Sequence, residues 1–172
     1  NYGAMKLASE ALISAASEVD LDRACIFRFP NVVGVPATHG VIFDFVNKLK
    51  ANPDSLDVLG DGSQQKSYLH ALDLVSAMLT VVSRKDEPKV NVVNIGPTDE
   101  GVTVKWIAEQ VVQRVSPGAL IRYGTGNKGW VGDVPKFNYS TQKLQSYGWV
   151  PALGSDGAIL KAVDEISTQL GC

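Results

Sequence analysis

Apolar and polar positions follow two different spacings along this chain. The clearest helical repeat covers residues 104–115, where six apolar side chains share one face and Thr103 precedes them as a cap. Short apolar runs between the helical segments, such as residues 22–29, are typical of buried parallel strands. The pattern predicts helices over 2–18, 40–51, 73–84, 104–115, 141–147 and 155–170, and strands over 22–29, 56–59, 65–70, 90–95 and 119–123. Alternation of helices with short strands predicts an α/β fold.

Three local expectations follow from the same pattern. The helix over residues 2–18 is apolar around most of its circumference, which predicts burial on more than one side. Residues 30–36 contain two prolines and a glycine and are predicted to form a loop. Asp73 is predicted to be the N-cap of the helix that follows it, and His70 a partly buried strand residue.

Composition excludes several classes of protein. The 172 residues are 45% hydrophobic and 20% charged, with a net charge of −2, and this length suffices for one domain with a sizeable core. No cluster of Lys and Arg suggests nucleic acid or an anionic membrane, and no apolar run approaches the roughly 20 residues of a membrane span. Two cysteines, Cys25 and Cys172, are too few for a disulfide framework and lack metal-ligand spacing. We therefore expect a cytoplasmic protein that binds no metal, nucleic acid or membrane.

Candidate catalytic chemistry begins at residue 2. Tyr2 and Lys6 are four positions apart at the start of the first predicted helix, so they stand on one face, one turn apart. An ammonium group there favours the phenolate form of the hydroxyl, which can accept a proton. Two solvated surface residues are the simpler explanation of such a pair, and the motifs that follow favour catalysis instead. Glu10, one turn further on, is expected to be an ion partner of Lys6.

Five segments carry recognisable motifs in a fixed order. They are Tyr2–Glu10 (YxxxK), Arg28–Gly34 (R-[FP]-x-N-V-x-G), Leu59–Asp73 (GDG-x-Q-x-R-[DE]-[FY]-x-[HY]-x-x-D), Val93–Gly96 (N-[IL]-G), and Gly132–Pro135 followed by Lys143 and Tyr147–Pro151 (PGDV…K…LGW-x-P). Together they cover nearly the whole chain. The sequence thereby resembles the extended short-chain dehydrogenase/reductases, in the NAD-dependent nucleotide-sugar epimerase/dehydratase branch that includes UDP-glucose 4-epimerase.

The resemblance implies a fold and a division into domains. The chain would be the C-terminal part of an NAD(P)-binding Rossmann-type enzyme, with most of its small substrate-binding domain. Residues 1–34 would hold the catalytic helix and the following Rossmann strand, and residues 35–172 mainly the substrate-binding domain, with Rossmann elements returning at about 65–96. The N-terminal half, whose GxxGxxG turn cradles the dinucleotide pyrophosphate, is expected to be absent. The glycine-rich loop that starts at Gly124 is not expected to replace it, because a proline follows instead of an apolar helix.

The resemblance also implies an activity, that of an NAD-dependent nucleotide-sugar 4-epimerase. Tyr2, as phenolate, would take the proton of the sugar 4-hydroxyl while hydride leaves C4 for the nicotinamide. The resulting 4-keto intermediate would turn over and receive hydride on its other face. Lys6 would support the phenolate and contact the nicotinamide ribose, so both residues also count as cofactor-binding. The intact protein would be a homodimer through the Tyr2–Lys6 helix, and the present chain is expected to be inactive alone.

Three residues are candidates for binding the nucleotide sugar. Asn31, just past a strand end, would offer its amide to phosphate or sugar, although a role in forming the turn before Gly34 is an equal alternative. Lys66 stands where the family often has an arginine on the diphosphate, and a lysine supplies charge without bidentate geometry. An exposed strand lysine is the other reading of Lys66. Ser67 replaces the more usual acidic residue, and Lys128 would be a second diphosphate contact.

Two rival functions remain open at this stage. One is a 4,6-dehydratase or a reductase of the same superfamily. The other is a non-catalytic binding module of the same fold, which Lys66 and Ser67 favour and which Tyr2 and Lys6 oppose. The sequence leaves the sugar, the nucleotide and the pathway undetermined.

Overall fold

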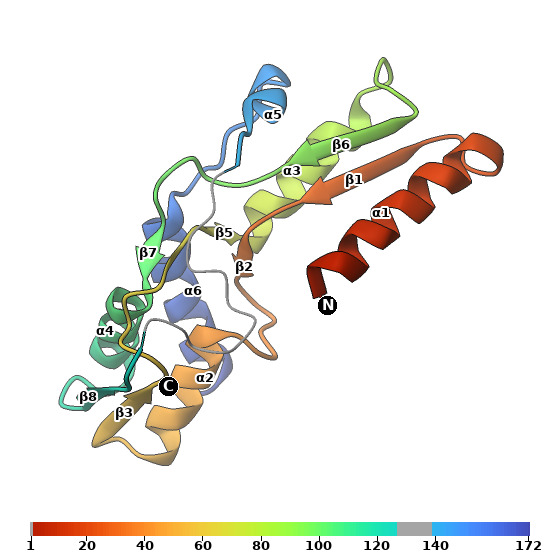
Figure 1. Cartoon of the computed structure of the whole chain (residues 1–172). Coiled ribbons are helices and arrows are strands. Elements are labelled where there is room, and N and C mark those ends of the chain that lie inside the picture. The colour runs from red at the N-terminus through yellow and green to blue at the C-terminus, as the bar shows by residue number, and fades with distance from the viewer. Residues whose placement is uncertain (1, 127–138) are drawn as a thin grey trace.

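The computed structural model describes residues 2–126 and 139–172, and these residues form four pairs of short strands and two hydrophobic cores (Figure 1). Three pairs are parallel: β1 (Ala24–Arg28) with β6 (Val90–Asn94), β2 (Asn31–Val33) with β5 (Tyr68–His70), and β3 (Ser55–Val58) with β8 (Leu120–Tyr123). The pair of β4 (Gln65–Lys66) and β7 (Val102–Thr103) is antiparallel. The helices of the described residues are α1 (Tyr2–Val19), α2 (Val41–Ala51), α3 (Ala71–Ser83), α4 (Val104–Val115), α5 (Gln142–Ser146) and α6 (Ser155–Gln169). Parallel pairs joined through helices confirm the expected α/β fold.

The larger core lies between α2, α4 and α6, beside β3 and β8; we call these five elements the helical lobe. Its fully buried side chains include Leu49, Leu56, Ile107 and Ile159. The predicted apolar face of α4 points into this core, and the Thr103 hydroxyl accepts a hydrogen bond from the Trp106 amide at 3.1 Å. Both the periodicity and the cap expected from the sequence are therefore confirmed.

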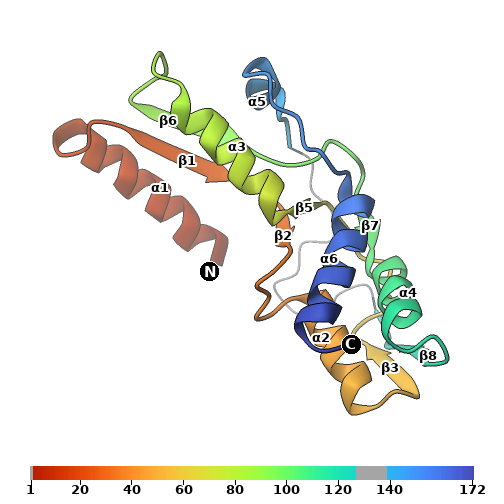
Figure 2. The same cartoon turned by 180° about the vertical axis from the view of Figure 1, so that it is seen from behind.

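The smaller core belongs to the sheet lobe, which consists of β1, β6, α1, α3 and α5. Its buried residues are Leu69, Ala77, Val81, Val93, Ile95, Leu144 and Trp149. Helices α1 and α3 lie on opposite sides of the β1–β6 pair, with α3 in front when the molecule is seen from behind (Figure 2). None of the described helices combines the length and the apolar character that crossing a bilayer requires.

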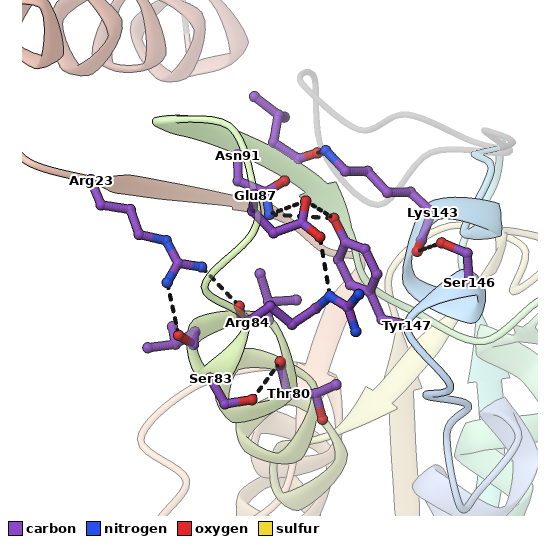
Figure 3. A network of polar contacts seen from close by, with 12 residues as sticks. Arg23, Thr80, Ser83, Arg84, Glu87, Asn91, Lys143, Ser146 and Tyr147 are labelled. Carbon is purple, nitrogen blue, oxygen red and sulfur yellow. Dashed lines mark hydrogen bonds and ion pairs between the residues drawn. The ribbon is translucent and has the colours of Figure 1, made fainter.

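A polar cluster holds the end of α5 against β6 and the segment that follows α3 (Figure 3). The Tyr147 hydroxyl donates to Glu87 Oε2 at 2.5 Å, and Arg84 Nε donates to Glu87 Oε1 at 3.1 Å. The Arg84 guanidinium also lies over the Tyr147 ring, 4.4 Å from its centroid. Lys143 adds a hydrogen bond to the carbonyl of Val92 in β6 at 3.1 Å. These contacts fasten a helix of five residues that could not be stable by itself.

The segment predicted as one strand over residues 65–70 is divided in two at Ser67. Its first part, β4, pairs antiparallel with β7, and its second part, β5, pairs parallel with β2. The crossing requires a glycine, because a Cβ on Gly101 would lie 2.1 Å from the carbonyl oxygen of Lys66. The partner strand β2 occupies part of the predicted loop over residues 30–36, so that prediction was wrong for residues 31–33.

The start of α3 also differs from expectation. The N-cap is His70, whose imidazole Nδ1 accepts a hydrogen bond from the Leu72 amide at 3.3 Å, so the Asp73 prediction was wrong. Asp73 instead accepts hydrogen bonds from the amides of Ala152 and Leu153 at 3.2 and 3.3 Å. The imidazole can cap because an unprotonated ring nitrogen is an acceptor, which leaves the carboxylate to anchor the segment before α6.

Helix α1 is far more exposed than its apolar composition predicts. Ser17 is its one buried residue among those described, whereas Met5, Leu12 and Val19 are 67%, 71% and 83% exposed. Their spacing of seven places them along one face. The element that α1 chiefly contacts is β1, which covers a single side of the helix. The expectation of burial on several sides was therefore wrong for the described residues.

Candidate functional site

Tyr2 and Lys6 lie together on an accessible surface of α1. The Tyr2 side chain is 75% exposed, and Lys6 Nζ lies 5.5 Å from the centroid of its ring. This separation is within the range of a cation–π contact, and it confirms that the two groups share one face of the helix. Helix α1 runs opposite to β1, so its first turn lies toward the carboxyl end of that strand (Figure 1). Parallel sheets place their ligands at this end.

Glu10 is bound by Arg28 across the α1–β1 contact. Arg28 Nε donates to Glu10 Oε1 at 2.8 Å and its Nη2 donates to Oε2, which is a bidentate pair. The hydrogen bond from Arg28 holds the pKa of Glu10 below its ordinary value. The expectation that Glu10 pairs with Lys6 was wrong, because the planar guanidinium engages both carboxylate oxygens at once. A separation of 18 positions hid this pair from sequence reasoning.

Strand pairing brings two predicted substrate residues close together. Asn31 begins β2 and is paired with Tyr68 of β5, and Lys66 and Ser67 directly precede Tyr68. Asn31 is exposed, Lys66 is half-buried and Ser67 is buried. The Ser67 hydroxyl is hydrogen-bonded to Tyr139, the pKa of which is raised by burial. Ser67 thus has a packing role, while Asn31 remains available to a ligand at the end of β1.

The Gly60–Gly62 turn lies beside the start of the glycine-rich loop. The Asp61 amide donates to the carbonyl of Gly126 at 2.8 Å. Asp61 Oδ1 accepts from the Ser63 hydroxyl and amide at 2.6 and 2.8 Å, and these hydrogen bonds lower the pKa of Asp61. Lys128, the third predicted substrate residue, lies outside the described residues.

The residues of α1 fit one end of a nicotinamide dinucleotide. An accessible phenol beside an ammonium group presents hydrogen-bond donors to the hydroxyls of a ribose, and neither side chain is enclosed. Among residues 2–126 and 139–172, no group of three or more His, Cys, Asp and Glu side chains could hold a metal ion.

Comparison with known proteins places these features in a family. The mouse dTDP-D-glucose 4,6-dehydratase is 28% identical over 168 residues, which are 95% of this chain and 46% of that protein. A putative UDP-glucose 4-epimerase of Methanocaldococcus jannaschii is 25% identical over 167 residues, 95% of this chain and 52% of that protein. The chain therefore spans about half the length of the curated relatives that it matches.

Solved structures agree with these matches. The crystal structure of a UDP-galactose 4-epimerase is 32% identical, with a TM-score of 0.85 over 98% of this chain and 54% of that one. The fold of MoeE5 in complex with UDP-glucuronic acid and NAD is also similar, with 22% identity and a TM-score of 0.80 over 99% of this chain and 56% of that one. The model of the NAD dependent epimerase/dehydratase family matches residues 1–96, more than half of the 172 residues. The chain belongs to the NAD dependent epimerase/dehydratase family, as its motifs predict.

Proposed function

We propose that the complete protein containing this chain is a nucleotide-sugar 4-epimerase of the UDP-glucose 4-epimerase type, with Tyr2 as its base. NAD is the cofactor of the family. The observation that carries the proposal is the accessible Tyr2–Lys6 pair in the first turns of α1, which lie toward the carboxyl end of β1.

Each residue of the pair has a distinct task. Bound NAD would supply the acceptor, and afterwards the donor, for hydride transfer at sugar C4. Tyr2 takes the proton from the sugar 4-hydroxyl and gives it back, which is general base and then general acid catalysis at one oxygen. The positive charge of Lys6 stabilises the phenolate and holds the cofactor ribose. The redox chemistry is the cofactor's, and the protein supplies position and a proton acceptor.

The substrate would be held by Asn31, Lys66 and Lys128. The β2–β5 register supports the first two, because it brings the Asn31 backbone next to the strand that follows Lys66. Lys128 rests on its sequence position alone. In the same proposal, residues 1–34 supply the catalytic helix and its strand, and residues 35–172 mainly bind the sugar, with Rossmann elements returning at about 65–96.

A 4,6-dehydratase is the second candidate, because the mouse relative carries that name at 28% identity. The two activities give different products. Purified complete gene product would be incubated with UDP-glucose and dTDP-glucose separately, and the products separated by chromatography. The proposal expects UDP-galactose from UDP-glucose, whereas a 4-keto-6-deoxy sugar from dTDP-glucose would establish the dehydratase. A reductase would form neither, and would consume reduced cofactor instead.

A binding module without chemistry gives a third pattern. It would form no product, and a Tyr2→Phe variant would bind nucleotide sugar as the wild type does.

The 172 residues alone are proposed to bind NAD weakly and to turn over nothing. Calorimetric titration of the isolated chain checks this point, and one-to-one micromolar binding of NAD would contradict it.

We further propose a cytoplasmic homodimer that forms through α1. The exposed face with Met5, Leu12 and Val19 supports a helix–helix contact, and Ala8 on the same helix permits close approach. A Leu12→Glu substitution would place a charge in that contact. Sedimentation of the complete protein would then show a monomer, and an unchanged dimer would place the interface elsewhere.

A further inference from the structure

Helix α1 carries the proposed base but is anchored by few contacts. Ser17, near its C-terminal end, is its one buried residue among those described, and Tyr2 lies 15 positions away. At a rise of about 1.5 Å per residue, these two positions are about 22 Å apart along the axis. Within the described chain, the element that α1 chiefly contacts is β1. A contact between the middle of α1 and β1 can therefore orient the first turn of the helix.

The Glu10–Arg28 ion pair provides that contact. It joins the middle of α1 to the last residue of β1 by two hydrogen bonds, one of them with Arg28 Nε 2.8 Å from Glu10 Oε1. The Glu10 side chain is 21% exposed and the Arg28 side chain is 53% exposed. Exposed ion pairs generally contribute little, but bidentate pairs of arginine with carboxylate are the exception because both groups are held in one orientation.

The pair also lies on the relevant face of the helix. Tyr2, Lys6 and Glu10 follow one another at intervals of four, so they form a single slowly drifting row along α1. Fixing Glu10 therefore fixes the rotation of the helix about its axis. A rotation equivalent to one residue, about 100°, would carry the phenol and the ammonium group out of position.

Arg28 connects the same contact to the proposed sugar site. The chain passes from Arg28 through Phe29 and Pro30 to Asn31, where β2 begins. Proline restricts the backbone of this short connection. Tyr2, the proposed base, and Asn31, whose amide is proposed to bind the substrate, are therefore both positioned relative to Arg28 at the end of β1.

We propose that Glu10 and Arg28 are positioning residues, whose ion pair sets the rotation of α1 and so the orientation of Tyr2 toward the substrate held at Asn31. This inference rests on the proposed function of Tyr2. It predicts an effect on catalysis that exceeds any effect on folding, because neither Glu10 nor Arg28 belongs to either core.

The test uses the complete gene product with UDP-glucose and NAD. Glu10→Gln and Arg28→Gln should each lower kcat by about tenfold or more, with KM for the sugar unchanged, since small misplacements of reacting groups are costly. The double variant should be no slower than either single one. Arg28→Lys keeps the positive charge but loses the two-donor geometry of the guanidinium, so its kcat should lie between those of the wild type and Arg28→Gln. The matched control is Asp164→Asn, which breaks the exposed Arg114–Asp164 pair between α6 and α4 (Nε to Oδ1, 2.8 Å) and should leave kcat unchanged.

The outcomes separate this inference from the function on which it rests. If Tyr2→Phe is inactive while Glu10→Gln and Arg28→Gln retain wild-type kcat, the positioning role is wrong and the proposed function stands. If the two variants lose activity only in proportion to a lowered melting temperature, the pair is merely structural and the inference also fails. A Tyr2→Phe enzyme with full activity would overturn the proposed function itself.

Discussion

The two lobes differ in how completely they cover the apolar side chains of their helices. In the helical lobe, α4 buries its apolar face, and Ile107 and Val111 are fully shielded. In the sheet lobe, α3 and α1 leave large side chains outside, and Leu79 and Leu12 are 65% and 71% exposed. Apolar periodicity predicts a helix in both cases, but burial depends on whether another element covers the face. Stability in the described chain therefore rests mainly on the helical lobe, and the candidate chemistry lies in the sheet lobe.

The largest expected effect separates activity from stability in the sheet lobe. Tyr2→Phe removes the hydroxyl of an exposed side chain and should lower kcat of the complete enzyme by about 10²–10⁴-fold, the usual contribution of a general base. Thermal unfolding should be unchanged, because the hydroxyl supports neither core. Parallel measurements of turnover and melting temperature would check this. A lowered melting temperature would show that Tyr2 is structural.

A core substitution in the helical lobe should have the opposite profile. Ile107→Ala should reduce the free energy of unfolding by about 2–5 kcal/mol, because it opens a cavity in a site that is fully buried. The matched substitution in the sheet lobe is Leu79→Ala. Because Leu79 is exposed, this change should alter the free energy of unfolding by less than about 0.5 kcal/mol. Denaturant titrations of the two variants test the comparison, and equal losses would mean that α3 is covered in solution.

A smaller effect is expected at the start of α4. Thr103→Ala removes the acceptor of the Trp106 amide and should cost about 1 kcal/mol of unfolding free energy. Thr103→Ser keeps the hydroxyl and should recover most of this loss. Chemical denaturation of both variants measures the cap, and a neutral Thr103→Ala would show that water satisfies the amide equally well.

The smallest predicted effect depends on pH and concerns the cluster in Figure 3. The hydrogen bond from Tyr147, with Arg84 nearby, holds the pKa of Glu87 below its ordinary 4.5. A lowered pKa stabilises the folded state above pH 4.5, and the contribution is lost as the pH falls through the folded-state value. Glu87→Gln should therefore melt below the wild type at neutral pH, with the difference vanishing in acid. Asp86→Asn, a change at an exposed neighbour, is the control. A difference that persists in acid would mean that charge is not involved.

The stability that this cluster contributes is also lost at high pH. Burial, and then the hydrogen bond to Glu87, raise the pKa of Tyr147 above its ordinary 10.0. A raised pKa contributes stability below pH 10 that is lost as the pH rises through the folded-state value. The contributions of both groups are therefore present together between these limits.

Sequence reasoning succeeded where the signal was local. The period of α4, the cap at Thr103 and the Tyr2–Lys6 spacing each depend on residues within a few positions of one another. It failed where distant segments decide the outcome. Asp73 is not the N-cap of α3, because its carboxylate accepts hydrogen bonds from amides near residue 152, and His70 caps the helix instead. Glu10 pairs with Arg28, which is 18 positions away, and not with Lys6. The exposure of α1 was not predicted for the same reason, since the composition of a helix does not show which other elements pack against it.

The most direct test of the account is a structure of the complete gene product with NAD and UDP-glucose. The account predicts that the Tyr2 hydroxyl lies within about 2.6–3.2 Å of the sugar 4-hydroxyl, with Lys6 at the nicotinamide ribose. A bound sugar whose 4-hydroxyl meets some other side chain, with Tyr2 directed away from the cofactor, would contradict it.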